Sequence, residues 1–233
     1  MNPVSYKEAE EIFNDIKSGV GGVSAEIVIC PPFTWLTDFS HKNFSPISFG
    51  AQNVFYEDKG AYTGEISPQM LKSSKVEYVI IGHSERRKYF SETDEIINKK
   101  IKKALEYGLK VIFCIGETAE ERDAGKKNEV LERQIKLGLQ DTTNYKLLTT
   151  NLNIAYEPVW AIGTGNNCGV DETKESVSFI RKFLSENTRI LYGGSVKSEN
   201  SGDYIKKAGA NGLLVGGASL NAEEFIKIVK SAE

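Results

Sequence analysis

The 233-residue sequence is poor in the features that mark specialised classes of protein. Its three cysteines, Cys30, Cys114 and Cys168, are far apart, odd in number and without metal-ligand spacing, so we expect reduced thiols in a cytoplasmic protein. The formal net charge of −3 gives no reason to expect nucleic acid or an anionic membrane as a partner. No stretch approaches the roughly 20 apolar residues that span a bilayer, and the N-terminus carries no apolar signal region.

Short apolar runs alternate with amphipathic helical patterns along the whole chain, which predicts βα repeats around a parallel sheet buried on both faces. We expect strands at Glu26–Cys30, Ile47–Asn53, Glu77–Gly82, Lys110–Ile115, Leu152–Tyr156, Arg189–Tyr192 and Leu213–Val215. We expect helices from Pro3 (capped by Asn2) to Gly19 and at Thr34–Phe39, Pro68–Lys75, Thr93–Tyr107, Ala119–Leu139, Asp171–Ser185, Glu199–Ala208 and Ala222–Val229. No linker or block of charge marks a domain boundary, so residues 1–233 are expected to form a single domain.

The distribution of glycine favours a barrel over an open sheet. An open doubly wound sheet usually has one glycine-rich nucleotide loop after its first strand, whereas here the glycines are spread over three late turns. The fold class that we predict is therefore α/β, of the TIM (β/α)8-barrel type. A complete barrel of this type needs one strand more than the seven that we find, placed before Asn2.

The segment 153–165 combines a strand, an acid and a glycine-rich loop. The apolar strand leads to Glu157, and Pro158 then ends the ladder because proline cannot donate to it. The loop that follows can move and can bring backbone N–H groups close to an anion, as expected of a general base beneath a lid. The alternative is a surface glutamate before an ordinary loop, but Trp160 and Ile162 are unusually bulky for an exposed loop tip.

One of the two histidines, His83, directly follows an expected strand and precedes the charged run Glu85–Arg87. In the functional interpretation, a helix N-terminus keeps the imidazole neutral so that it can polarise a substrate group. In the alternative, His83 is a helix-start residue bonded to the backbone and the charged run is solvated. The other histidine, His41, lies in a polar segment and is expected at the surface.

Two glycine pairs follow late strands directly: Gly193-Gly194, before Ser195, and Gly216-Gly217. Each pair alone is explained by a tight turn. Two in succession favour phosphate binding, because glycine lets backbone N–H groups converge on an anion at a helix N-terminus. In barrels this position belongs to the loops after the last two strands.

Taken together, these motifs resemble the triosephosphate isomerase family over essentially the whole chain. The matching segments are Gly82–Arg87, Ala155–Gly165, Tyr192–Val196, Leu214–Ser219, Cys114–Glu117 and Ala61–Glu65. The resemblance implies interconversion of dihydroxyacetone phosphate and glyceraldehyde 3-phosphate, in glycolysis and gluconeogenesis, without cofactor or metal.

The resemblance also implies residue roles. Glu157 would move the proton, neutral His83 would polarise the carbonyl and stabilise the enediolate, and Glu85 would be a supporting acid. The substrate phosphate would be held by Gly163, Ser195, Gly216 and Gly217. In the family's usual homodimer, Thr63 would reach into the partner subunit.

Two departures from the family pattern affect these expectations. The lid continues with Asn166-Asn167-Cys168 where the family usually has a lysine-led hinge, so closing rates could differ. The family opens with a strand leading to Asn-x-Lys-Met-Asn, whereas this sequence starts at Met1-Asn2. We therefore expect a seven-stranded barrel with isomerase activity absent or strongly reduced. An internal methionine taken as the start and a natural truncation explain this equally well.

Two other functions remain open at this stage. A non-catalytic barrel could keep the phosphate-binding turns, although such a scaffold needs neither Glu157 nor His83. Another phosphate-handling barrel isomerase, acting on sugar phosphates, is disfavoured by the same two motifs. Turnover of triose phosphates, compared with binding of a phosphate ligand without turnover, separates these alternatives.

Overall fold

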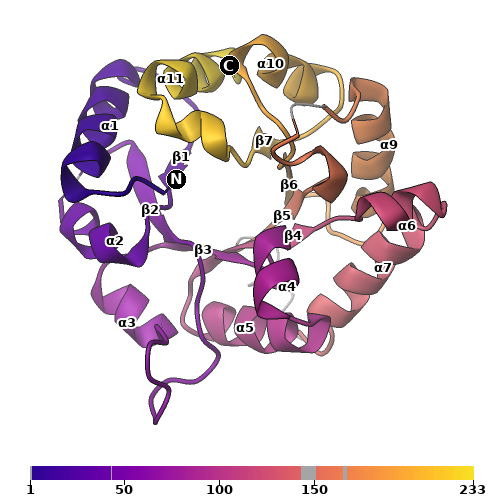
Figure 1. Cartoon of the computed structure of the whole chain (residues 1–233), viewed down its shortest axis with the longest axis horizontal. Coiled ribbons are helices and arrows are strands. Elements are labelled where there is room, and N and C mark those ends of the chain that lie inside the picture. The colour runs from indigo at the N-terminus through magenta and orange to yellow at the C-terminus, as the bar shows by residue number, and fades with distance from the viewer. Residues whose placement is uncertain (1, 43, 143–150, 165–166) are drawn as a thin grey trace.

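One parallel sheet contains all the strands of the computed structural model, which describes residues 2–42, 44–142, 151–164 and 167–233 (Figure 1). Its strands, in both chain and spatial order, are β1 (Ile27–Ile29), β2 (Ile47–Ala51), β3 (Tyr78–Ile81), β4 (Lys110–Ile115), β5 (Leu152–Tyr156), β6 (Arg189–Tyr192) and β7 (Gly212–Leu213). Each strand pairs in parallel with the next. The predicted TIM-type α/β fold and its seven strands are confirmed. Within the described residues, β1 and β7 do not pair with each other, so the sheet has two edges.

Helices surround this sheet on its outer face (Figure 1). They are α1 (Tyr6–Gly19), α2 (Phe33–Ser40), α3 (Pro68–Ser73), α4 (Ser84–Phe90), α5 (Asp94–Glu106), α6 (Ala119–Asp123), α7 (Lys127–Gly138), α9 (Val170–Arg181), α10 (Ser198–Lys206) and α11 (Ala222–Ser231), with short 3-10 turns η1 (Val159–Ala161) and η2 (Gly217–Leu220). Helix α1 packs against α11, and Gly19 of α1 leaves room for Ile226 of α11. The helical ring therefore closes where the sheet does not.

Three features of the helices differ from the sequence-based prediction, in addition to shifts of one to four residues at other helix ends. The first helix begins at Tyr6 and is capped by Ser5, whose hydroxyl accepts the Glu8 N–H at 3.2 Å, so Asn2 is not its cap. The helix expected at Ala119–Leu139 is two helices, α6 and α7, because Gly125 adopts a left-handed conformation between them. Helix α4, directly after His83, was not among the predicted helices.

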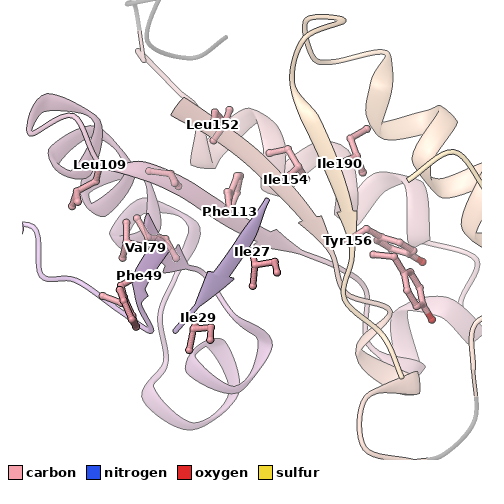
Figure 2. Packing of buried hydrophobic residues seen from close by; sticks show 14 of the residues in the cluster. Ile27, Ile29, Phe49, Val79, Leu109, Phe113, Leu152, Ile154, Tyr156 and Ile190 are labelled. Atoms are coloured by element: carbon pink, nitrogen blue, oxygen red, sulfur yellow. The ribbon is translucent and has the colours of Figure 1, made fainter. Parts of the chain in front are cut away.

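Side chains alternate between the two faces of the sheet. One set packs against the helices and forms the main core with helix residues such as Ile97 and Ile101. Figure 2 shows strand residues of this set, including Val79, Phe113 and Ile154, none of which has any exposed surface. The alternate set belongs to a separate, smaller cluster: Tyr78, Ile80, Ile112, Cys114 and Ala155.

The smaller cluster faces a cavity of about 1520 Å³. Tyr78 and Ile112 line it, together with Glu26 and Arg189 from the amino ends of β1 and β6. Glu26 accepts hydrogen bonds from the Tyr78 hydroxyl and from the Arg189 guanidinium. This contact ties the start of β1 to β3 and β6 at the amino end of the sheet, although β1 shares no ladder with either strand.

Candidate active site

The seven residues predicted to act on substrate or phosphate all line the one cavity: Glu157, His83, Glu85, Gly163, Ser195, Gly216 and Gly217. They come from the carboxyl ends of β3, β5, β6 and β7. Because parallel strands end on the same side of a sheet, residues that are far apart in sequence meet there. Thr63 does not line this cavity; it is exposed in the segment between β2 and α3, which projects beyond the ring of helices (Figure 1).

Glu157 directly follows β5 and is only 2% exposed. Its Oε2 accepts the Ser84 backbone N–H at 3.0 Å, and its Oε1 lies 3.1 Å from Nε2 of His83. Burial raises the pKa of this carboxyl, although His83, the Ser84 N–H and the Cys114 thiol favour its charged form. A carboxylate with a raised pKa is a stronger base than an exposed one, so this glutamate is suited to accept a proton.

His83 is the N-cap of α4. Its Nδ1 accepts the Glu85 backbone N–H at 3.3 Å, so the ring proton lies on Nε2, which faces Glu157. The Nε2 edge of the imidazole therefore faces the carboxylate, with Nε2 and Oε1 3.1 Å apart. The interpretation of His83 as a helix-start residue bonded to the backbone is confirmed, and the same bond orients the ring; that His83 polarises a substrate group stays a prediction.

The charged run after His83 divides into two parts. The Glu85 side chain is 67% exposed, and its Oε2 lies 3.8 Å from His83 Nδ1, beyond hydrogen-bonding distance. Arg87 donates to the Gly82 carbonyl at 2.9 Å and to Asp94 at 2.6 Å, which fixes the turn that carries His83. The run is therefore a structural support behind His83, with Glu85 at the rim of the cavity.

The described part of the glycine-rich loop, residues 158–164, is named here the lid segment. Trp160 is partly buried, and its indole N–H donates to Glu117 at 2.8 Å. The Ala161 carbonyl accepts the Ser195 hydroxyl at 2.7 Å, which links the lid segment to the turn after β6. Gly163 is exposed and has a φ of 70°, a conformation that favours glycine.

The glycines of the site are of two kinds. A Cβ added at Gly163, Gly216 or Gly217 would meet no atom within 4 Å, so packing does not require glycine there and the backbone is open to a ligand. At Gly116 a Cβ would lie 1.6 Å from the Glu157 carbonyl oxygen, and at Gly193 it would lie 3.0 Å from Cγ of Glu157. These last two glycines, after β4 and β6, let the neighbouring backbone approach Glu157 from both sides.

Two residues at the site escaped the sequence-based prediction as contributors to its geometry. Glu117 has no exposed surface, and its Oε1 accepts the Trp160 N–H and, at 3.1 Å, the Tyr156 hydroxyl. Ser84 presents its N–H to Glu157. Both residues lie inside motifs that the sequence analysis identified. The residues that they contact come from other strands, and nothing in the sequence indicated these contacts.

The arrangement supports acid–base chemistry at carbon next to a carbonyl. A buried carboxylate and a neutral N–H donor share one cavity, and open backbone turns face the same space. Among the described residues, no three His, Cys, Asp or Glu side chains gather closely enough to hold a metal ion. None of the described helices is long and apolar enough to cross a membrane.

Comparison with known proteins agrees with this geometry. The family model described as triosephosphate isomerase matches residues 1–232. A triosephosphate isomerase of Alkaliphilus oremlandii is 46% identical over 98% of this chain and 95% of its own length. Those of Dictyoglomus turgidum and Endomicrobium trichonymphae are 48% and 49% identical, over 96% and 97% of this chain and 93% of each relative. The chain belongs to the triosephosphate isomerase family.

Proposed function

We propose that the chain interconverts dihydroxyacetone phosphate and D-glyceraldehyde 3-phosphate, in glycolysis and gluconeogenesis in the cytoplasm. The observation that carries this proposal is the pair formed by the buried Glu157 carboxylate and the His83 N–H, 3.1 Å apart in the cavity. The name of the family and the names of its relatives support the same reaction. Proton transfer between adjacent carbons needs one base and one group that stabilises the oxygen of the intermediate.

The reaction follows from the two side chains. A substrate carbonyl binds to His83 Nε2, which lies 3.1 Å from Glu157 Oε1, and the carboxylate removes a proton from the adjacent carbon. The His83 N–H stabilises the oxygen of the enediolate. Glu157 then returns the proton to the neighbouring carbon while the hydroxyl proton passes from one substrate oxygen to the other, so the carbonyl has moved by one carbon and the enzyme is unchanged.

Phosphate binding is proposed for the open turns. Gly163, Gly216 and Gly217 have no neighbouring atoms where a side chain would point, and Ser195 lies next to the lid segment through Ala161. Backbone N–H groups at such turns hold an anion without a charged side chain. Glu85 is proposed as a supporting acid at the rim, near His83.

We further propose that the 233-residue polypeptide by itself has strongly impaired activity. In the family resemblance, the lysine that contacts the substrate lies in an Asn-x-Lys segment that residues 1–233 do not include. Removal of a preorganised cation aimed at developing negative charge costs about 10²- to 10³-fold in rate. The two unpaired sheet edges in the described residues also leave the strands beside the cavity with a single ladder each.

A turnover assay on triose phosphates tests both proposals. It compares residues 1–233 with the same chain preceded by an apolar strand that ends in Asn-x-Lys, and Glu157→Gln in the extended chain is the matched control. High turnover by the extended chain alone supports the assignment and the impairment. Equal, fast turnover contradicts the impairment. If neither chain turns over but both bind glycerol 3-phosphate, the non-catalytic phosphate-binding barrel is the better function.

A homodimer is proposed from the family resemblance and from exposed aromatic rings. Tyr62, beside Thr63, is 44% exposed, and Tyr89 and Phe90 of α4 are 66% and 65% exposed. Apolar side chains of this size at the surface mark interaction sites. Sedimentation of Thr63→Arg beside the unchanged chain tests the contact, because a charged side chain in a packed interface shifts the chain to monomer.

A further inference from the structure

Arg122 of α6 contacts the lid segment through Trp160. The centre of its guanidinium lies 3.9 Å from the centroid of the indole ring, the distance of a cation–π contact. The edge of the same ring donates its N–H to Glu117 at 2.8 Å. The indole is therefore held at its face by Arg122 and at its edge by Glu117, and both residues lie in the segment that follows β4.

The same guanidinium binds the first turn of α9. Its Nε donates to Glu172 Oε1 at 3.2 Å and its Nη2 donates to Oε2 at 3.1 Å, the two-bond geometry that arginine forms with a carboxylate. Lys127 lies 3.8 Å from Glu172 Oε1 and adds a second, longer ion pair. Because α9 is the next helix after the lid segment, Arg122 joins elements on both sides of it.

We propose that Arg122 is a positioning residue, which fixes Trp160 relative to the start of α9 and so sets the path of the lid segment beside Glu157. The proposal rests on the proposed function. Trp160 lies three residues after Glu157, and its neighbour Ala161 accepts the Ser195 hydroxyl at 2.7 Å. A rotation of the indole therefore moves the backbone between the base and the turn proposed to bind phosphate. Arg122 does not line the cavity that Glu157 lines.

The contacts of Arg122 contribute too little to the free energy of unfolding for stabilisation to be their main role. The Arg122 side chain is 41% exposed, and ion pairs at exposed sites contribute little to stability. The planar guanidinium nevertheless satisfies two partners in one orientation, which a lysine cannot reproduce. The effect of its loss is therefore expected in the position and dynamics of Trp160 more than in the unfolding temperature.

The test uses Trp160 as a spectroscopic reporter. The chain has two tryptophans, so Trp35→Phe leaves Trp160 alone. In this background we compare Arg122→Gln, Arg122→Lys and Glu172→Gln. The control is Arg133→Gln on α7, an equally charged arginine that is 51% exposed, pairs with Asp94 and Glu121, and makes no contact with Trp160 among those described.

For Arg122→Gln we expect lower anisotropy and stronger acrylamide quenching of Trp160, with kcat, measured in the chain extended by the Asn-x-Lys strand, reduced about 3- to 10-fold. Arg122→Lys should recover part of both, and Arg133→Gln should change neither. Unchanged Trp160 fluorescence and kcat in Arg122→Gln, or a fall in Tm as its only effect, would overturn the proposal. If neither the unchanged chain nor the chain extended by the Asn-x-Lys strand turns over triose phosphates, the proposed function fails, while the anisotropy and quenching still decide the role of Arg122.

Discussion

The middle of the sheet and its two ends are built differently. Strands β3, β4 and β5 are buried along nearly their whole length and pair on both sides. Strand β1 has three residues and β7 has two, and each pairs on one side within the described part of the chain. His83 and Glu157 follow β3 and β5, whereas Gly216 and Gly217 follow β7. The proposed acid–base pair therefore lies on the better-supported part of the sheet, and part of the proposed phosphate site lies at an edge.

The difference indicates which step of function depends on the middle of the sheet and which depends on its ends. A pair of side chains 3.1 Å apart needs strands that hold their register, which the long ladders from β3 to β5 provide. Backbone turns that bind an anion tolerate more movement, because several N–H groups share the charge. We therefore expect chemistry to depend on the middle of the sheet, and substrate affinity to depend on its ends.

The largest expected effect is loss of turnover on substitution of Glu157. Glu157→Gln removes the base but keeps its size, and general acid–base groups contribute about 10²- to 10⁴-fold to rate. Steady-state kinetics on triose phosphates should show the loss in kcat, with Glu175→Gln, an exposed acid on α9, unchanged. Retention of most of the activity by Glu157→Gln would show that the middle of the sheet does not carry the base.

Substitution of one leucine in the middle of the sheet and one at its edge compares the packing of these two regions. Leu152 of β5 is 3% exposed, whereas Leu213 of β7 is only partly buried. Leu152→Ala should lower the free energy of unfolding by about 2–5 kcal/mol, and Leu213→Ala by about 1 kcal/mol, because a cavity forms only where neighbours surround the side chain. Urea unfolding of both variants tests this, and equal losses would mean that β7 packs as tightly as β5.

The pH dependence of stability offers a further comparison, between the Glu117 carboxylate at the site and the Glu26 carboxylate at the amino end of β1. Burial raises the pKa of Glu117 above its ordinary value of 4.5, despite hydrogen bonds from Trp160 and Tyr156. At the amino end of β1, burial is outweighed by hydrogen bonds from Tyr78 and Arg189, which lower the pKa of Glu26. The two groups therefore contribute to stability with opposite sign as pH changes.

For each carboxyl, the sign of its effect on stability follows from whether the folded or the unfolded state holds the proton more strongly. As pH rises from 4.5, the unfolded chain releases the Glu117 proton before the folded protein does, so this group lowers the free energy of unfolding until the folded-state pKa is passed. Glu26 stabilises above 4.5, and this contribution is lost as pH falls through its folded-state pKa. Urea unfolding across pH should show that Glu117→Gln removes a decline on the alkaline side of 4.5 and Glu26→Gln a decline on the acid side. Parallel profiles for the two variants would contradict this assignment.

The sequence predicted the strands well because most of them are short, mainly apolar runs that a glycine or proline closely follows. It also indicated the residues that line the cavity, since they belong to local motifs at strand ends; their roles stay predictions. It did not predict the start of α1 at Tyr6, because Pro3 is an equally good helix start, or the break at Gly125, because a single glycine is tolerated within helices. Contacts such as Arg122 with Glu172 join residues 50 positions apart, and periodicity carries no information on such pairs.

The two crowded glycines beside Glu157 have a consequence for how this site can change over generations. At Gly116 any larger residue would overlap the main chain of Glu157, and at Gly193 it would press on the carboxylate's own stem. A larger residue is therefore not tolerated at these two positions, whereas Gly216 and Gly217 have empty space around them. Substitutions that alter substrate preference are therefore expected at the outer turns, whereas the two glycines beside Glu157 leave no room for a larger side chain.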